Sequence, residues 1–245
     1  MNTRQKDILA LVEKRGEITI RELSEHFSVS TMTIHRDLEH LEEQRYLFKK
    51  RGAAVFVEQT DRNDGDFYAE EKRAIGIAVA KMIKHGQSII FDNSTTALEC
   101  AKYMDLSMRC TFYTTSIETA TVLSKFKNSV LYCSGGYFFP ETRGFIGTQA
   151  EQFVSSLKAD VCIIGFSGIS LEGGLTGPYP MHTELEKKII ASAKKRIVVA
   201  DHSKFGKVAL EKVAEFSDID VIVTDSGLSD ELYEQYRDHV NIIKV

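Results

Sequence analysis

The sequence predicts an α/β chain in two parts: an N-terminal winged helix-turn-helix, then a C-terminal Rossmann-like domain with a mostly parallel sheet. Residues 1–57 place apolar side chains at helical spacing and end in two short β-prone runs. From residue 68 onward, apolar runs alternate with amphipathic segments, as in repeated strand-helix-strand units. With 245 residues, 43% of them hydrophobic, the chain can form two domains with a sizeable core.

The first segment, residues 3–15, is predicted to be an amphipathic helix. Its inward residues at helical spacing are Ile8, Leu11 and Val12. Gly16 is typical of a residue that ends a helix, because glycine adopts the left-handed backbone conformation without strain.

A helix-turn-helix pattern follows over residues 18–41. Thr19 and Glu22 have the spacing of a capping box at the start of its first helix, and Ser30 is placed to cap the second. The second helix buries one stripe, formed by Ile34, Leu38 and Leu41. Side chains near its start and off that stripe would project into a DNA major groove; they are Ser30, Thr31, Met32, Thr33, His35 and Arg36. The alternative is two amphipathic helices that pack in any small α domain.

The β-prone runs at residues 46–57 surround a basic turn and predict a wing. Its cationic side chains would meet DNA phosphates and position the second helix; they are Lys49, Lys50 and Arg51. The alternative is a solvated surface hairpin. Residues 58–66 hold no apolar side chain, so we place a linker at 58–67 between a DNA-binding domain at 1–57 and an effector domain at 68–245.

The second domain is predicted to alternate strands with helices. The strands are expected at residues 88–92, 111–115, 130–134, 161–165, 197–201, 221–225 and 241–245. The helices are expected at residues 69–84, 97–104, 118–126, 149–157, 184–193 and 228–236.

Small or polar residues end these strands one after another. Because ligands bind outside the carboxyl ends of parallel strands, the loops should converge on one crevice that takes a polar ligand. The candidate ligand-binding residues there are Asp92, Asn93, Ser94, Thr95, Thr96, Thr115, Ser116, Gly135, Gly136, Gly165, Ser167, Gly168, Asp201 and Lys204.

A phosphate suits the loop at Asn93–Thr96, because that loop leads directly into a helix whose free N–H groups favour an anion. Lys204 would supply a cation, and Asp201 could accept hydrogen bonds from sugar hydroxyls. Glu184 at the start of a predicted helix would be a ligand contact or a favourable first-turn carboxylate. The alternatives for the first loop and for Gly135–Gly136 are an ordinary capped turn and a simple glycine turn.

Composition excludes several classes of protein. The net charge of −4 leaves no general basic surface, and residues 1–57 carry ten Lys/Arg against nine Asp/Glu, so any contact with nucleic acid must be local. The four cysteines lie in apolar runs without zinc-site spacing, which indicates reduced core residues and no metal. We expect no cofactor, and no Ser-His-Asp or Cys-His arrangement is evident. The absence of a signal peptide or long apolar run indicates a cytoplasmic protein with no membrane association.

Taken together, the chain resembles the DeoR family of bacterial transcription regulators, the group that includes the glycerol-3-phosphate repressor. The resemblance covers nearly the whole chain. It is carried by residues 29–38, 50–54, 92–96, 114–116, 135–136, 160–168 and 201–206, with Glu184 and Lys188. The sequence departs from the usual family pattern at His35, Arg51 and Asn93.

This resemblance implies a repressor of a sugar-catabolic operon that binds an operator in double-stranded DNA and is relieved by a phosphorylated sugar. It implies a second domain similar in fold to ribose-5-phosphate isomerases and CoA transferases, a dimer or tetramer, and ligand contacts from Glu184 and Lys188. The chain is then not an enzyme. The rival hypothesis is an isomerase-like enzyme in which Asp201, Glu184 or Lys204 moves protons. A third is a protein-interaction module whose helix-turn-helix no longer binds DNA.

Overall fold

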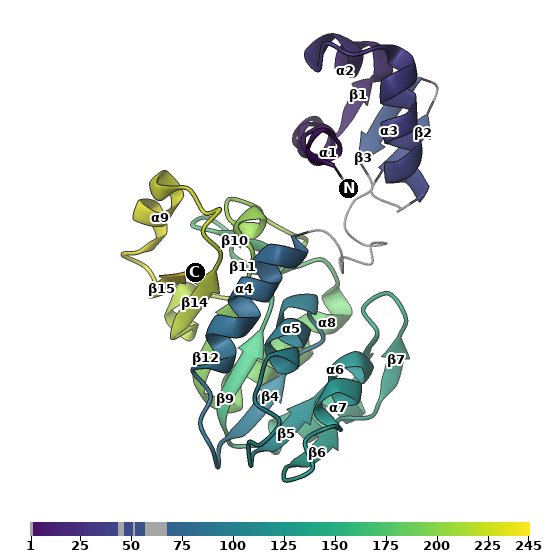
Figure 1. The fold of residues 1–245 in the computed structure, drawn as a ribbon. Helices are drawn as coiled ribbons and strands as arrows, with labels where there is room; N and C mark the ends of the chain where they lie inside the picture. Colours follow the sequence, from purple (N-terminus) through teal and green to yellow (C-terminus); the bar gives the residue numbers. More distant parts are fainter. Residues whose placement is uncertain (1, 44–46, 51, 57–67) are drawn as a thin grey trace. The chain divides into compact units, whose positions relative to one another are not determined.

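The computed structural model describes residues 2–43, 47–50, 52–56 and 68–245. The chain divides into two compact units, Met1–Asn63 and Asp64–Val245, and each is described here by itself (Figure 1). The predicted linker at 58–67 lies outside the described residues. The predicted domain boundaries therefore stay predictions.

The first unit is a winged helix-turn-helix, as expected. Its elements are α1 (Thr3–Arg15), β1 (Glu17–Thr19), α2 (Ile20–His26), α3 (Thr31–Glu43), β2 (Leu47–Lys50) and β3 (Ala53–Phe56). The strands form an antiparallel sheet in the order β1-β3-β2. Strand β1 was not among the predicted elements, because its three residues carry no periodicity.

Caps define the helices of this unit as predicted. The Thr19 hydroxyl accepts a hydrogen bond from the Glu22 amide (3.2 Å), and the Glu22 carboxylate accepts one from the Thr19 amide (2.9 Å). Gly16 ends α1 with φ at +76°, in the region that favours glycine. The expectation for Leu11 was wrong: it is partly exposed, while Leu9 is fully buried, because the inward stripe of α1 is centred one position earlier.

The second unit is built on a parallel sheet of seven strands in the order β15-β14-β12-β9-β4-β5-β6. The strands are β4 (Ser88–Phe91), β5 (Thr111–Thr114), β6 (Val130–Cys133), β9 (Ala159–Ile164), β12 (Ala193–Val199), β14 (Val221–Thr224) and β15 (Ile242–Lys244). The helices are α4 (Ala69–Ala80), α5 (Thr95–Lys102), α6 (Ile117–Leu123), α7 (Thr148–Ser155), α8 (Pro180–Ala191) and α9 (Asp230–Tyr236). All seven predicted strands and six predicted helices are present, and the predicted fold class is confirmed.

Five short strands of this unit were not predicted. β7 (Tyr137–Phe139) and β8 (Gly144–Ile146) form a hairpin. β10 (Gly168–Ser170), β11 (Gly174–Gly177) and β13 (Glu211–Ala214) form a small antiparallel sheet. Segments of three or four residues carry too little periodicity to reveal a strand.

Two apolar layers cover the parallel sheet, because alternate residues of each strand face opposite sides. In β4, Ile89 and Phe91 join the layer made with α4, α5 and α6, while Ile90 joins the layer made with α7 and α8. Figure 1 shows α4 and α5 next to each other over the sheet. Burial on both faces explains why these strands read as continuous apolar runs in the sequence.

The cysteines are only partly as expected. Cys100, Cys110 and Cys162 are buried, but Cys133 is exposed. Cys133 belongs to β6, the edge strand of the sheet, of which neither face is fully covered. Among the described residues, no helix is long and apolar enough to cross a membrane.

Candidate functional site

The outward face of α3 is the candidate nucleic-acid interface. Ile34, Leu38 and Leu41 are fully buried, which leaves the opposite face of the helix to solvent. Arg36 and Met32 lie on that face, and Met32 has 71% of its surface exposed, while Thr31 and His35 are exposed near the start of the helix. A helix that shows hydroxyl, imidazole and guanidinium groups without burying them offers the donors and acceptors that read base edges.

Ser30 and Thr33 serve the helix itself. The Ser30 hydroxyl accepts a hydrogen bond from the Thr33 amide (3.2 Å) and bonds to the Thr33 hydroxyl (2.9 Å). The preceding turn is held by Ser24, whose hydroxyl donates to the Val29 carbonyl (2.6 Å). These contacts fix where α3 begins, and hence which side chains stand at its exposed start.

A buried carboxylate that the sequence analysis did not single out anchors α3 to α1. Asp37 is 4% exposed. Its two carboxylate oxygens accept hydrogen bonds from the Arg4 guanidinium (2.6 Å) and from the side-chain amide of Gln5 (3.0 Å). Asp37 directly follows Arg36, so this anchor holds the exposed face of α3 in one orientation. The sequence signal was its position beside the apolar stripe of α3.

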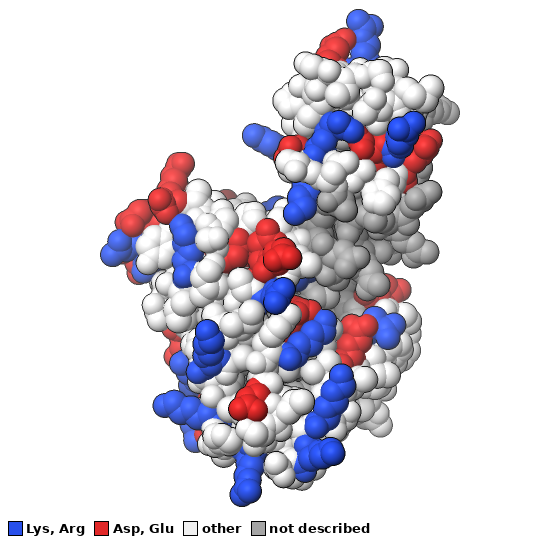
Figure 2. Space-filling view, viewed as in Figure 1, with Lys and Arg blue, Asp and Glu red and all other residues white. Residues whose placement is uncertain are grey.

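The predicted wing is present as the antiparallel pair β2 and β3, with Lys49 opposite Ala54 and Lys50 opposite Ala53. The side chains of Lys49 and Lys50 are not among those described, and Arg51 lies outside the described residues. On the face drawn in Figure 2, basic and acidic side chains are interspersed over both units. The interspersed charges agree with the near balance of charge along the sequence.

In the second unit, the chain order reverses between β4 and β9. From β4 the chain moves outward to β5 and β6, and it returns to β9 on the other side of β4. Ligands of open parallel sheets bind at such a switch point, outside the carboxyl ends of the strands. The loops that follow β4 and β9 are therefore the centre of the candidate effector crevice.

Asp92 ties these two loops together. One carboxylate oxygen accepts from the amide (3.0 Å) and hydroxyl (2.7 Å) of Ser94, and the other accepts from the Gly165 amide (2.8 Å). Burial raises the pKa of Asp92 to about 6, and these donors oppose the rise. Gly165 is required here, because a Cβ at that position would lie 2.6 Å from the Ser94 side chain.

The N-terminus of α5 directly follows the loop after β4. Ser94 caps the helix by accepting from the Ala97 amide (3.2 Å). Within the described part of the chain, no acceptor bonds to the amides of Thr95 and Thr96. Those two N–H groups and the helix dipole can receive an anion.

The ends of β5 and β6 support a neighbouring part of the rim. Ser116 caps α6 through the Thr119 amide (3.2 Å), and the Thr115 carbonyl accepts from the amide of Phe145, the middle residue of β8 (2.7 Å). Gly135 and Gly136 have positive φ, and a Cβ on Gly136 would lie 2.7 Å from the Ile146 carbonyl oxygen. This glycine pair therefore makes a turn and a close approach to β8.

Two candidates near the end of β9 lie in different settings. Ser167 is partly exposed in the loop, and its amide donates to the Thr176 carbonyl (3.2 Å). Gly168 is buried in β10, where a Cβ would meet the Thr176 hydroxyl. In the loop after β4, the Asn93 side chain packs against Gly144 of β8, where a Cβ would collide with it.

Asp201 follows β12 and is completely buried. One carboxylate oxygen accepts from the Ser203 amide (3.0 Å), while the other has no hydrogen-bond partner among the described residues. Lys204 is partly exposed at the end of the short helical turn His202–Lys204. A buried, unpaired acceptor and a partly exposed cation three residues later in the chain suit a ligand that carries both hydroxyl and phosphate groups.

His202 links this loop to the start of α4. Its ring bonds to the Asp225 carboxylate (2.8 Å), which raises the pKa of His202. The ring also packs edge-on against Tyr68, with 5.1 Å between the ring centroids. Tyr68 is the residue that precedes α4.

On α8 the structure corrects the position of Glu184. The helix begins at Pro180 rather than near residue 184, because proline is favoured in the first turn. Glu184 is therefore in the second turn, where it pairs with Lys187 (3.0 Å) and lies 4.0 Å from Lys188. All three side chains of this group retain substantial exposure.

Two ionisable side chains that α8 turns inward, His182 and Glu186, were not among the residues selected from the sequence. Glu186 has a buried carboxylate oxygen without a hydrogen-bond partner among the described residues. Burial, with the nearby charge of Asp92, raises the pKa of Glu186 to about 8. The signal was available, because Leu185 and Ile189 mark the buried stripe on which residues 182 and 186 also fall.

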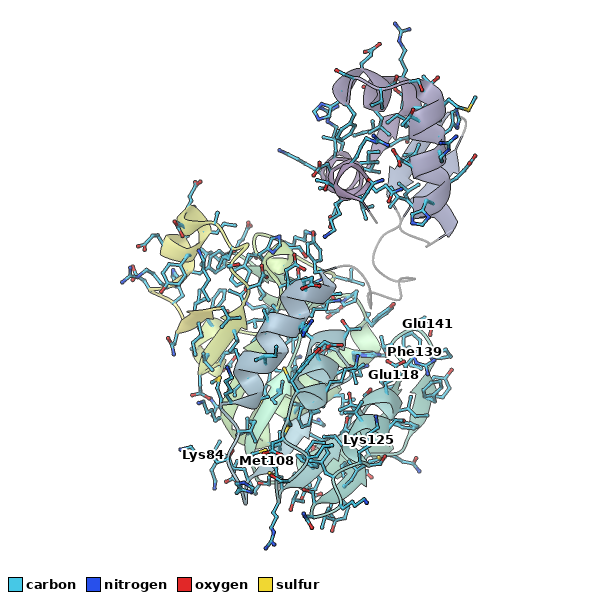
Figure 3. All side chains as sticks on the ribbon, viewed as in Figure 1. Lys84, Met108, Glu118, Lys125, Phe139 and Glu141 are labelled. Carbon is cyan, nitrogen blue, oxygen red and sulfur yellow. The ribbon has the colours of Figure 1, made fainter. Side chains whose placement is uncertain are left out.

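His182 fastens the β7–β8 hairpin to α8. Its ring lies between Phe139 and Tyr179, with centroid distances of 5.4 Å to each, and its Nε2 is 3.5 Å from the Thr142 hydroxyl. Burial lowers the pKa of His182 to about 4, so the ring is neutral at neutral pH. Figure 3 labels Phe139 of this hairpin and Glu118 of α6, and Glu118 pairs with Arg143 in the turn of the same hairpin (2.6 Å).

Metal chemistry finds no support in the part of the chain that the structure describes. No group of three His, Cys, Asp or Glu side chains is placed to hold a metal ion there. The chemistry on offer is hydrogen bonding and charge: helix N–H groups, hydroxyls, a cation and two incompletely bonded carboxylates.

Comparison with known families covers almost all of the chain. Residues 4–60 match the DeoR-like helix-turn-helix domain, and residues 68–226 match the DeoR C terminal sensor domain. The resemblance noted from the sequence is thereby confirmed.

Similar proteins include three repressors. The transcriptional repressor AccR of Agrobacterium fabrum is 34% identical and is matched over 91% of this chain and 89% of its own length. The transcriptional repressor GlcR of Bacillus subtilis is 34% identical, with 89% and 86% covered. The glycerol-3-phosphate regulon repressor of Escherichia coli is 29% identical, with 96% and 95% covered.

Among solved structures, ribose 5-phosphate isomerase A of Methanocaldococcus jannaschii aligns with 56% of this chain and 55% of its own, at 16% identity and a TM-score of 0.41. The translation initiation factor eIF-2B of Pyrococcus horikoshii aligns with 89% and 86%, at 16% identity and a TM-score of 0.45.

Proposed function

The chain belongs to the DeoR family of DNA-binding transcription regulators, and from that premise we propose that it represses a sugar-catabolic operon until a phosphorylated sugar binds its second domain. Its relatives of similar length are named as repressors, so the chain is a regulator and not an isomerase-like enzyme. It would act in the cytoplasm, where its operator lies.

The observation that carries the DNA-binding half is the exposed start of α3. Arg36 is exposed there, and the adjacent Asp37 fixes α3 against α1. The Arg36 guanidinium therefore projects from a helix held in one position. Arginine reads guanine in the major groove through two parallel hydrogen bonds. We propose that Arg36, Thr31 and His35 contact bases, and that the wing cations hold phosphates.

A matched pair of variants tests this assignment. Arg36→Ala should weaken binding to the operator by about 1–3 kcal/mol and relax its sequence specificity. Arg15→Ala removes the same charge from the exposed end of α1 and should leave specificity unchanged. Fluorescence anisotropy with the DNA upstream of the adjacent operon measures both. Equal operator affinity for wild type and Arg36→Ala would remove Arg36 from the reading face, and no sequence-specific binding at all would favour the interaction-module hypothesis.

For the effector half, the strand-end crevice supports a phosphorylated sugar. The phosphate would lie on the amides of Thr95 and Thr96, with Lys204 as a counter-charge. The unpaired oxygen of Asp201 would accept a sugar hydroxyl. Contacts from Asn93, Thr115 and the other strand-end candidates, and from Glu184 and Lys188, remain part of this proposal.

Release requires that the effector bind one arrangement of the protein better than another, because only differential affinity shifts an equilibrium. Titrating phosphorylated sugars into the protein–operator complex tests it, and the expected result is a loss of anisotropy. A broad panel without effect would refute the effector half and leave DNA binding intact. We also propose a dimer or tetramer on repeated half-sites, which sedimentation of the protein–DNA complex would reveal.

A further inference from the structure

Strand β6 is an edge of the seven-stranded sheet, and it is both apolar and exposed. It ends the strand order, with β5 as its neighbour on one side (Figure 1). Val130 and Tyr132, which lie on the same face of the strand, are 52% and 48% exposed. Residues 128–140 contain no charged side chain, in a chain of which 27% is charged. Soluble proteins protect such an edge, because its free N–H and C=O groups attract another strand.

The opposite edge of the same sheet is protected. Strand β15 ends the sheet on that side. Its Ile242 is buried, and its Lys244 ammonium bonds to the Asp230 carboxylate and to the Leu228 carbonyl (2.8 Å each). A lysine on an edge strand discourages pairing with another chain. Strand β6 has no such charge, so the two edges of this sheet differ in what they can accept.

The backbone of β6 has two residues whose polar groups point outward. The Val130 amide donates to the Cys110 carbonyl on the β5 side (3.1 Å). The Ser134 amide also donates to β5 (3.1 Å). Because backbone groups alternate sides along a strand, those of Leu131 and Cys133 point away from β5. One more strand can therefore be added at this edge through Leu131 and Cys133.

We propose that β6 pairs with β6 of a second copy of this chain, antiparallel and about a two-fold axis at Tyr132. An uncharged segment can face itself without repulsion, and a two-fold contact closes after two copies. Pairing of β6 with β15 of another copy would instead leave a free edge at each end, and it would disturb the ion pair of Lys244. The contact names a surface for the oligomer of the proposed function, on which it rests.

The register of this pairing follows from the outward-pointing groups. Antiparallel strands exchange hydrogen bonds between residues whose backbone groups face each other. With Leu131 opposite Cys133 of the second copy, both hydrogen-bonded pairs lie within β6. Shifting the register to either side would require pairing at Ser129 or Gly135. The Ser129 amide is bonded to a carbonyl three residues earlier (3.2 Å), and Gly135 has a φ of +62°, so neither continues the strand. This register places Tyr132 opposite its own copy.

The Tyr132 ring is already ordered for such a contact. It stacks on the ring of Tyr113 in β5, with 5.3 Å between the centroids and 13° between the ring planes. Across the two-fold axis, the two Tyr132 residues would form a non-hydrogen-bonded pair, in which Cα atoms are about 4.5 Å apart. Aromatic pairs at this spacing stabilise antiparallel strands. Since Tyr113 holds the ring, Tyr132 would lose little side-chain freedom on pairing.

Disulfide crosslinking of the full chain tests the surface and the register together. Tyr132→Cys in a Cys133→Ser background places two thiols opposite each other, within the Cα distance that a disulfide allows. With copper phenanthroline as oxidant, we expect an interchain disulfide on a non-reducing gel.

Val130→Cys in the same Cys133→Ser background is the matched control. It lies on the same face of β6, but in this register its two copies are about 13 Å apart along the strand, too far for a disulfide. The wild-type chain, with Cys133 opposite Leu131, should also remain uncrosslinked.

Analytical ultracentrifugation of Tyr132→Lys measures the strength of the contact. Two lysines would repel at the axis and the aromatic pair would be lost, so the dissociation constant of the oligomer should rise by about thirtyfold or more. Leu106→Lys changes another exposed apolar residue, outside β6, and should behave as wild type. Thermal melting of both variants checks folding.

Two results would overturn the inference and leave the repressor and its oligomer standing. One is crosslinking at Val130 and not at Tyr132, and the other is an oligomer that Tyr132→Lys does not weaken. A wild-type chain that sediments as a monomer would refute both this surface and the proposed oligomer. DNA binding by the same chain is measured separately by anisotropy, so its failure is distinguishable from that of the β6 contact.

Discussion

Replacing Glu186 by glutamine in the ligand-free protein should remove a pH dependence from its stability. The native state keeps a proton on Glu186 up to about pH 8, whereas the unfolded chain loses it near the ordinary value of 4.5. Between these values the unfolded state binds fewer protons than the native state, so the free energy of unfolding falls as pH rises. The variant Glu186→Gln cannot titrate at this position and should lack this contribution.

The size of the effect follows from the pKa values. While one group is protonated only in the native state, each rise of one pH unit lowers the free energy of unfolding by about 1.4 kcal/mol. Between about pH 6 and pH 8 the loss should approach 2 kcal/mol, an upper value because Glu186 is not wholly shielded from water. Asp92 contributes little in this window, since its pKa is about 6 and it is ionised above that.

Urea denaturation followed by circular dichroism gives the required free energies at about pH 6, 7 and 8. The difference between wild type and Glu186→Gln should shift by about 2 kcal/mol across that range, in the direction that destabilises wild type at high pH. Other titrating groups are common to both proteins and cancel in this difference. Parallel stability curves for the two proteins would show that Glu186 is not held protonated, and the reasoning would fail.

Three further predictions concern other parts of the chain. Asp37→Ala should destabilise the first unit by about 1–3 kcal/mol in thermal melting, because it leaves the buried Gln5 amide without its acceptor; an unchanged melting temperature would contradict the anchor. Asp225→Asn should lower the pKa of His202, which NMR of the imidazole ring measures. A histidine whose pKa is raised in the folded protein stabilises the fold most fully below its ordinary pKa of 6.5. The variant should therefore lose more stability at about pH 6 than at about pH 9. Cys133 should react first with a thiol reagent, as the other three thiols are buried; prompt labelling of several thiols would refute this.

The sequence was a good guide wherever the determining interactions were local. The Thr19–Glu22 capping box, the end of α1 at Gly16 and the parallel-sheet strands all followed from spacing and composition. It was a poorer guide to the short strands β7, β8, β10, β11 and β13, which form because the chain around them brings partners together. The exposure of Cys133 was also not predictable from neighbouring residues, because it depends on β6 being an edge strand of the sheet.

The candidate sites divide in the same way. The sequence by itself predicted a candidate DNA-reading helix and a set of polar strand ends, because an apolar stripe or a strand end depends on residues that are close together in the sequence. Only the tertiary structure decided that β9 lies beside β4, that Asp92 joins their loops, and that Glu186 rather than Glu184 has a buried carboxylate oxygen. The physical reason is that α8 begins at Pro180 and packs its Leu185–Ile189 stripe on the core, and this packing sets the direction of every other side chain on the helix.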